Sequence, residues 1–231
     1  MNQDNKHENF FDAWAIYRKV IDNNYMYHDE IICAVKEKLS DKKSLSILDL
    51  GCGDSHVISN SIAPEQLKNY LGIDISESAL DFSKQNLINH KANIAHIAGD
   101  LLFESVKLNS KFDVVMAGYS IHHLDTEEKD IFFSKISDLL TEKGVFIFYD
   151  LMSREEETPL EYNTRACNIY KNDWNTMNEV EIEGILSHIM ENDCAENRAF
   201  YLEAWAKHGL VNIEKSFQDQ NDLFVLYFIR K

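Results

Sequence analysis

Residues 47–55 have the sequence Ile-Leu-Asp-Leu-Gly-Cys-Gly-Asp-Ser. The apolar run predicts a buried β-strand that ends with Asp49, and the glycines predict a tight turn into a helix. In open α/β sheets such a turn lies at the carboxyl edge, where glycines let the backbone approach a ligand that helix N–H groups face. Because a predicted strand precedes it, this Gly-x-Gly indicates a nucleotide-type binding crevice.

Strands alternate with helical stretches from Leu45 to Leu151. Helical periodicity marks Ser76–His90 and Thr126–Lys143, and Gly144 stands where a helix C-cap is expected. This alternation predicts βαβ units and a mostly parallel sheet. The five strands predicted here are Ser46–Leu50, Tyr70–Asp74, Ile94–Ala98, Phe112–Ala117 and Val145–Asp150.

Helices are predicted on both sides of this core. Glu8–Ser40 has the pattern of two helices with a break at Asn23-Asn24, and Arg154–Asn197 that of two more, with Asn178 and Glu181 as a capping pair. A helix over Arg198–His208 and two strands, Val211–Phe217 and Leu223–Ile229, follow. We therefore expect an α/β fold, a three-layer sheet of seven strands whose last strand is antiparallel. The expected single domain, 1–231, comprises N-terminal lid helices (1–42), a binding core (45–151), a helical cap insertion (152–197), and a final helix with a β-hairpin (198–231).

Two acidic residues follow the next predicted strands. Asp74 stands 21 positions after Gly53, about the separation at which an acidic residue meets ribose hydroxyls. Asp100 ends the segment Ala98-Gly99-Asp100. A helix N-cap or turn is the alternative role for each carboxylate taken alone.

The segments ILDLGCGDS, GIDIS, AGDLL, FDVVMAGYSIHHL and LLTEKGVFIFYD resemble the successive motifs of class I, Rossmann-like methyltransferases that depend on S-adenosylmethionine (SAM). The resemblance spans about residues 45–151 and implies SAM as methyl donor and S-adenosylhomocysteine (SAH) as product. It implies that the glycine loop frames the methionine portion, that Asp74 holds the ribose and that Asp100 meets the adenine. The cofactor contacts expected on this basis are Asp49, Gly51, Cys52, Gly53, Asp74, Ile75, Asp100, Leu101 and Ala117, with Tyr17 and Tyr27 from the lid.

Two departures bear on the cofactor. Many members of this family have a third glycine where this chain has Ser55. A nicotinamide dinucleotide would need a glycine at the position of His56, where the backbone must approach a pyrophosphate closely. SAM has no phosphate, so the sequence favours SAM over the dinucleotide.

His122 and His123 are the candidate catalytic residues, because they follow the fourth strand at the edge where ligands bind. Histidine has a suitable pKa for a general base, which an alcohol, phenol or protonated amine acceptor would need. A structural role is the alternative, and His122 is favoured because Ile121 and Leu124 are expected to face inward. No metal is expected: the fourth strand ends in Ala117-Gly118 without a carboxylate, adjacent histidines should diverge, and a third ligand is not evident.

The acceptor is predicted to be a small molecule that is methylated on O or N rather than C. Lid residues Tyr17, Tyr25, Tyr27 and His28 would close over SAM. The cap would line the acceptor pocket with Tyr162, Arg165, Tyr170 and Trp174, Arg165 offering a site for an anionic group. A protein-directed methyltransferase and a non-catalytic SAM-binding module remain as alternatives.

The composition of the chain limits which classes of molecule it is expected to bind. A net charge of −16 without a basic stripe argues against nucleic acid, and the two prolines do not form the Pro-containing motifs of DNA methyltransferases. The polar first residues and the lack of a long apolar run argue against a secretory signal and a membrane span. Four scattered cysteines favour reduced thiols. We expect a cytoplasmic monomer or homodimer.

Overall fold

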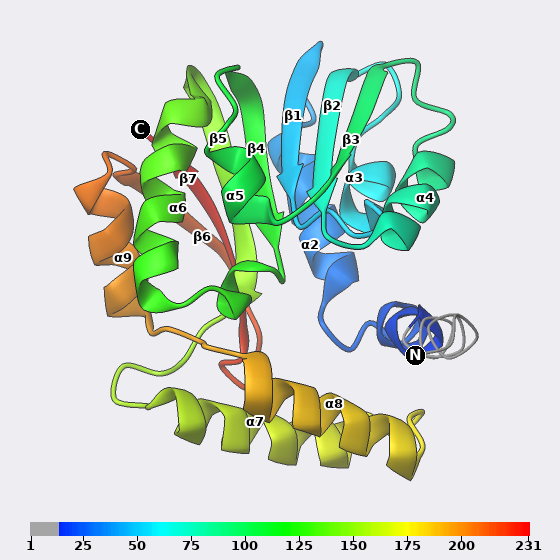
Figure 1. Ribbon diagram of the computed structural model, residues 1–231, viewed down its shortest axis with the longest axis vertical. Helices are drawn as coiled ribbons and strands as arrows, with labels where there is room; N and C mark the ends of the chain where they lie inside the picture. The colour runs from blue at the N-terminus through cyan, green and yellow to red at the C-terminus, as the bar shows by residue number, and fades with distance from the viewer. Residues whose placement is uncertain (1–13) are drawn as a thin grey trace.

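The computed structural model describes residues 14–231, which form a sheet of seven strands in the order β3-β2-β1-β4-β5-β7-β6 (Figure 1). Strands β1 to β5 pair in parallel, and β7 enters antiparallel to both β5 and β6. The predicted seven-stranded, Rossmann-like α/β sheet with an antiparallel last strand is confirmed. The strands are β1 Leu45–Leu50, β2 Leu67–Asp74, β3 Asn93–Ala98, β4 Phe112–Gly118, β5 Leu140–Leu151, β6 Asn212–Gln218 and β7 Phe224–Arg230.

Helices cover both faces of the sheet because its central strands are apolar on both sides. In β1, Ile47 packs on the face covered by α2 and α3, whereas Leu48 and Leu50 pack on the face covered by α6 and α9. Figure 1 shows the two helical layers. The helices of the first layer are α2 His28–Lys38, α3 His56–Ser61 and α4 Glu77–Asn86; those of the second are α5 Leu101–Ser105, α6 Thr126–Leu139 and α9 Arg198–Lys207.

Several predicted boundaries shift by a few residues, and after α6 the shift changes the type of element. The helix expected to continue to Lys143 ends at Leu139, and Gly144 lies inside β5 instead of capping a helix. Leu140 is already extended and fully buried, and it pairs with Phe112 across a register shift in β4. Burial of this leucine in the sheet outweighs the helical propensity of the residues that follow it.

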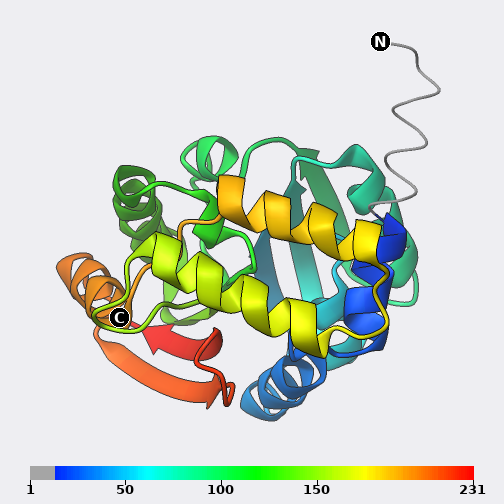
Figure 2. The ribbon, with the colours of Figure 1, turned by 90° about the horizontal axis from the view of Figure 1, so that it is seen from below.

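The helices α7 (Pro159–Asp173) and α8 (Glu179–Asn192) lie side by side across the carboxyl ends of the parallel strands (Figures 1 and 2). Each begins with a capping box, and that of α8 is the predicted Asn178–Glu181 pair. Residues 14–22 are helical, and Lys19 forms a 2.6 Å ion pair with Glu181 that joins this segment to α8. These three helical segments therefore cover the carboxyl edge of the sheet, where the glycine loop lies.

Within the described part of the chain, none of the helices is both long enough and apolar enough to cross a membrane.

Candidate active site

The glycine loop connects β1 to α3 and is held tightly. Gly51 and Gly53 have φ angles of +73° and +51°, which favour glycine. A Cβ on Gly51 would lie 2.5 Å from the Cβ of Ser120, so a side chain does not fit there. The N–H groups of Gly51 and Cys52 both donate to the carbonyl of Ile73, at 2.8 and 3.0 Å. The loop thus presents bare backbone at the end of the sheet.

Asp74, at the end of β2, is oriented by this loop. Its Oδ2 accepts a hydrogen bond from the N–H of Gly53 at 2.8 Å, and its Oδ1 accepts one from the N–H of Ser76 at the same distance. Each carboxylate oxygen keeps a further lone pair. The carboxylate can therefore still receive two hydroxyl donors, as a ribose would offer.

Asp49 is a buried acid at the base of the same loop. Its side chain is 2% exposed and accepts a 3.0 Å hydrogen bond from the hydroxyl of Tyr70. Burial, with smaller contributions from the nearby Asp74 and Asp54, raises the pKa of Asp49 to about 7, although the hydrogen bond from Tyr70 opposes the shift. A cationic ligand in this crevice would relieve the cost of ionising the group. The residues present therefore fit a positively charged ligand with a ribose.

A cavity of about 210 Å³, called here the donor cavity, lies between the loop and the N-terminal helix. Six of the predicted cofactor residues come together in its wall. Tyr17 closes one side and donates a 2.9 Å hydrogen bond to Oδ1 of Asp54. The residues that line the donor cavity are Tyr17, His28, Asp49, Gly51, Cys52, Gly53, Ser55, His56, Val57, Asp74, Met116, Gly118, Tyr119 and Tyr149.

Other predicted cofactor residues lie outside this cavity. Ile75 follows Asp74 and is 79% exposed. Asp100 caps α5 by accepting a 2.8 Å bond from the N–H of Phe103, and the partly buried Leu101 follows it. Ala117 is fully buried in the layer of α6.

Tyr27 is not brought to the glycine loop. It has a left-handed φ of 56° at the N-cap of α2, and its ring packs against Phe217 and Phe224 in a separate cavity. The N-terminal segment turns this ring toward β6 and β7, so the expectation that it contacts the cofactor is not supported.

A second cavity, of about 470 Å³, lies beneath the cap and is called here the acceptor cavity. It shares Tyr17, His28 and Tyr119 with the donor cavity. Its apolar walls come from the lid, β5 and the cap, and its polar end combines three histidines with an aspartate. The lining residues are Ile16, Tyr17, Val20, Met26, His28, Tyr119, His122, His123, Leu151, Tyr170, Trp174, Gly184, Ile185, His188, Ile189 and Asp193.

His122, in the 3₁₀ turn η1 (Ile121–His123), is oriented by Asp150 at the end of β5. Its Nδ1 lies 2.5 Å from Oδ1 of Asp150. This Oδ1 also accepts from the N–H of Leu151, and Oδ2 of the same carboxylate accepts from the N–H of Ile121. Burial opposes ionisation of Asp150, but the charge and hydrogen bond of His122 bring its pKa below the usual value. Burial likewise disfavours a charged His122, yet Asp150 raises its pKa overall. Because an ionised carboxylate only accepts, Nδ1 carries a proton. Nε2 lies on the side of Asp193.

His123 lies beside His122, with its side chain 43% exposed. Burial, followed by repulsion from His122, lowers the pKa of His123 to about 4, so this ring is neutral near pH 7. The two imidazole centroids are 4.0 Å apart, and Oδ1 of Asp193 lies 3.7 Å from Nε2 of His122 and 3.6 Å from Nδ1 of His123.

These distances correct part of the sequence interpretation. The adjacent histidines do not diverge, because the tight turn brings both rings to Asp193, a side chain that sequence reasoning missed. Asp193 stands 70 positions after His123, so spacing does not reveal it. One ligand atom from each of the three side chains lies within 4.8 Å of the others.

The cap aromatics divide between two roles. Tyr170 and Trp174 line the acceptor cavity, as predicted, and Tyr25 stacks on Trp174 from outside. Tyr162 is fully buried and donates to the carbonyl of Leu223, so it supports the cap instead of facing the cavity.

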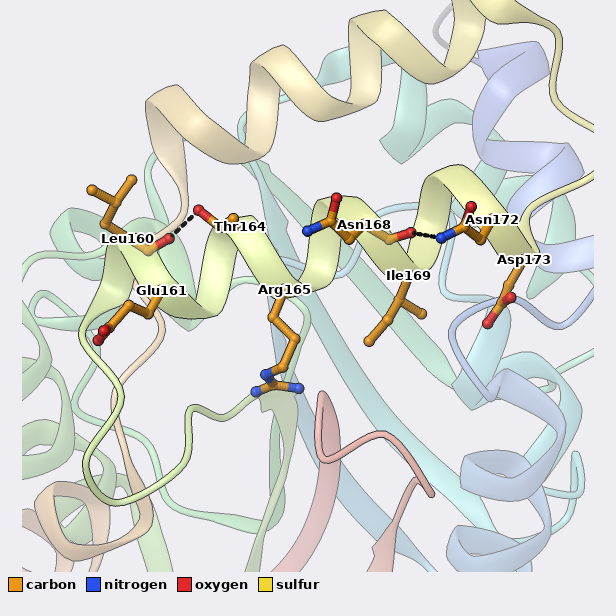
Figure 3. A pocket seen from close by; sticks show the side chains of 8 residues that line it. All are labelled: Leu160, Glu161, Thr164, Arg165, Asn168, Ile169, Asn172 and Asp173. Carbon is orange, nitrogen blue, oxygen red and sulfur yellow. Dashed lines mark hydrogen bonds between the residues drawn. The ribbon is translucent and has the colours of Figure 1, made fainter.

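Arg165 does not face the acceptor cavity. It lies in a groove of about 580 Å³ along the outer side of α7, and Figure 3 shows its guanidinium extending from that helix. There it binds Glu157 at 2.6 Å and donates to the carbonyl of Asn221 at 2.7 Å. Thr164 and Asn172 in the same groove bond carbonyls of their own helix, as the dashed lines show. The expectation that Arg165 binds an anionic substrate group inside the cap is wrong, because its charge is already paired.

Tyr149 is a wall residue that the motifs did not indicate. Its ring crosses Gly118 at the end of β4, where a Cβ would lie 1.8 Å from Cζ of the tyrosine. The one signal in the sequence is this glycine after an apolar strand, which marks a close approach.

The comparisons with known proteins agree with this geometry. A family model described as a methyltransferase domain matches residues 41–217, which is more than half of the chain. The chain belongs to this methyltransferase family.

This methyltransferase has relatives of low sequence identity. An uncharacterized methyltransferase of Bacillus mycoides is 24% identical over 151 residues, which are 64% of this chain and 68% of that protein. A SAM-dependent methyltransferase of Clostridium acetobutylicum superposes with a TM-score of 0.65 at 15% identity, covering 95% and 98% of the two chains. The mycolic acid cyclopropane synthase CmaA1, solved with SAH, gives 0.54 at 15% identity and covers 76% and 58%. These structural likenesses show a shared class I, Rossmann-like fold.

Proposed function

We propose that the methyltransferase transfers the methyl group of SAM to an oxygen or nitrogen of a small molecule that binds in the acceptor cavity. The observation that supports this most directly is the shared wall of the two cavities: Tyr17, His28 and Tyr119 line both. A donor at the glycine loop and an acceptor under the cap would meet there. Such alignment is the main requirement of methyl transfer, since the sulfonium already activates the carbon.

We place the donor by the residues that fit it. Asp49, Gly51, Cys52 and Gly53 would surround the methionine portion, and Asp74 would hold the ribose. Farther along the edge, Asp100 and the backbone of Leu101 would meet the adenine. Ile75, which follows Asp74 and is 79% exposed, is accessible to the base in this placement.

His122 is the proposed group that engages the acceptor. Its side chain lines the cavity, and in the neutral ring the bond from Nδ1 to Asp150 leaves the lone pair on Nε2. Hydroxyl and amine acceptors need such a group, whereas a carbon acceptor gains less from it. This arrangement favours O- or N-methylation, and His122→Ala should slow turnover while SAM affinity stays the same.

The apolar walls favour a small molecule over a peptide. Trp174, Ile185 and Ile189 of the cap face the cavity, whereas a basic peptide would need an open acidic groove. Trp174→Ala should therefore raise KM for the acceptor and leave SAH affinity unchanged.

The proposal is tested with the purified chain and SAM labelled in its methyl group, incubated with a deproteinised metabolite pool and, separately, with cell proteins. Label in the small-molecule fraction supports the proposal. Label confined to proteins would establish the protein-directed alternative. Saturable SAM binding without transfer to either pool would indicate a non-catalytic SAM-binding module.

A further inference from the structure

We propose that His122, His123 and Asp193 form a binding site for a divalent transition-metal ion of the zinc and iron(II) class, with open coordination positions toward the acceptor cavity. The site is distinct from the donor cavity, since none of these three residues lines it. Its use for an acceptor rests on the proposed function, whereas metal binding itself does not.

The first support is an unpaired buried oxygen. The side chain of Asp193 is 5% exposed, and within residues 14–231 its Oδ1 has no hydrogen-bond donor. A buried carboxylate oxygen without a partner costs free energy, so such atoms are normally hydrogen-bonded or bound to an ion. The nearest nitrogens, at 3.6 and 3.7 Å, are too far for hydrogen bonds.

The second support is the spacing of the three atoms. Two ligands that each bind zinc at about 2.0–2.1 Å in tetrahedral geometry lie roughly 3.3 Å apart. The observed 3.6 and 3.7 Å from Asp193 to the two histidines exceed this value by a few tenths of an ångström. The ring nitrogens of the two histidines lie within 4.8 Å of each other, so side-chain rotations must also shorten this third distance to bring the three atoms onto one ion.

The third support is the tautomer of His122. Metal-binding histidines usually donate their other ring N–H to a carboxylate, which turns the remaining lone pair toward the metal. Asp150 does this for His122 and is itself fixed by backbone N–H groups of Ile121 and Leu151. Nε2, the nitrogen that faces Asp193, is therefore the one that carries the lone pair.

The backbone around Asp193 is locked in place. The N–H of Cys194 donates to the carbonyl of His122 at 2.8 Å, which ties the end of the cap to η1. The carbonyl of Cys194 accepts a 2.6 Å bond from Lys129, whose side chain is fully buried, and Asn163 donates to the carbonyl of Asp193 at 3.1 Å. These bonds fix the backbone that carries the Asp193 side chain near the histidines.

Two histidines and one carboxylate leave positions for exogenous ligands, which is typical of catalytic zinc and non-haem iron(II) sites. His188 also lines the acceptor cavity, but its side chain is 59% exposed, and its Nε2 lies 4.0 Å from Oδ1 of Asp193, farther than the nitrogens of His122 and His123. We therefore assign it no bond to the metal. An acceptor that bears a hydroxyl or nitrogen would occupy an open position. With the ion bound, His122 would act on this acceptor through the ion, because its one ring lone pair cannot bind both.

The experiment uses the full chain after removal of metal with a chelator and dialysis. Zn²⁺ affinity is measured by competition with a chromophoric chelator, and Co²⁺ binding by its visible absorption. We expect one ion per chain, with affinity reduced about 100-fold or more in Asp193→Asn and in His123→Gln; the latter changes a half-exposed side chain and spares the core. Asp130→Asn is the matched control, because Asp130 also contacts a histidine, His208, but is paired with Lys207 on the surface.

Failure of the wild-type chain to bind an ion more tightly than Asp193→Asn would overturn the proposal, as would equal losses in Asp130→Asn. SAH binding is measured on the same metal-free samples and should be unchanged in all variants. Metal binding without SAH binding would contradict the proposed function alone, and SAH binding without a metal site would contradict this inference alone.

Discussion

The carboxylate of Asp74 accepts a 2.8 Å hydrogen bond from the backbone N–H of Gly53, which lies 21 positions earlier in the chain. The bond couples the end of β2 to the glycine loop. The carboxylate that would bind the ribose therefore also fixes the backbone that would frame the methionine portion.

Asp74→Ala should weaken SAH and SAM binding by at least about 10-fold, because hydrogen bonds to a charged group contribute about 1.5–3 kcal/mol each. Isothermal titration calorimetry measures this. Asp81→Ala, which removes a surface carboxylate paired with Lys84 on α4, is the control and should bind normally. Equal affinities in the two variants would remove the ribose assignment.

Asp49 should make the free protein less stable as pH rises. Its folded pKa of about 7 exceeds the unfolded value, so between about pH 4 and 7 the unfolded chain releases a proton that the folded chain keeps. The loss, on the order of 4 kcal/mol, is complete above about pH 7. Asp49→Asn cannot ionise and should be more stable than the wild type at pH 8, with the difference shrinking toward pH 4. Urea denaturation at both pH values checks this; a constant difference would show that Asp49 is ionised throughout.

Tyr17→Phe should loosen the lid. The variant loses the 2.9 Å hydrogen bond to Asp54 while keeping the ring in the wall between the two cavities. We expect SAH to dissociate about 10-fold faster, as measured by stopped-flow displacement. Tyr25→Phe is the comparison, since its hydroxyl bonds Thr176 of the cap and its ring does not line the donor cavity. Equal dissociation rates in wild type and Tyr17→Phe would show that this bond does not hold the lid.

Gly118→Ala should destabilise the protein by about 1–3 kcal/mol, because the new methyl group would overlap the ring of Tyr149. In the background Tyr149→Ala the same change should cost little, which a double-mutant cycle of thermal unfolding would show. Gly184→Ala provides the opposite control: with open space around its Cβ in α8, it should gain about 0.5–1 kcal/mol. If the losses of stability from Gly118→Ala and Tyr149→Ala are additive in the double variant, the proposed overlap between the new methyl group and the ring of Tyr149 is contradicted.

Much of the donor site could be predicted from the sequence because it is built from local segments. A strand, its terminal carboxylate and the following glycines form one continuous stretch around Gly51, and Asp74 ends the neighbouring strand. Parallel pairing of β1 with β2 brings these strand ends to one edge of the sheet. At Leu140 the helical sequence pattern competed with pairing to Phe112 in the sheet, and burial of Leu140 in the sheet ended the helix there.

The acceptor side was decided by tertiary structure. Asp193 reaches the histidines only because the cap crosses the sheet edge and Cys194 bonds η1. Arg165 lies outside the cavity, where it forms a largely buried ion pair with Glu157. The sequence by itself determined the sheet, the glycine loop and the acidic residues that follow it, since periodicity and turn chemistry act over neighbouring residues. Only the folded chain decided which side chains from the lid, η1 and the cap meet, because such contacts depend on packing between segments that are distant in the sequence.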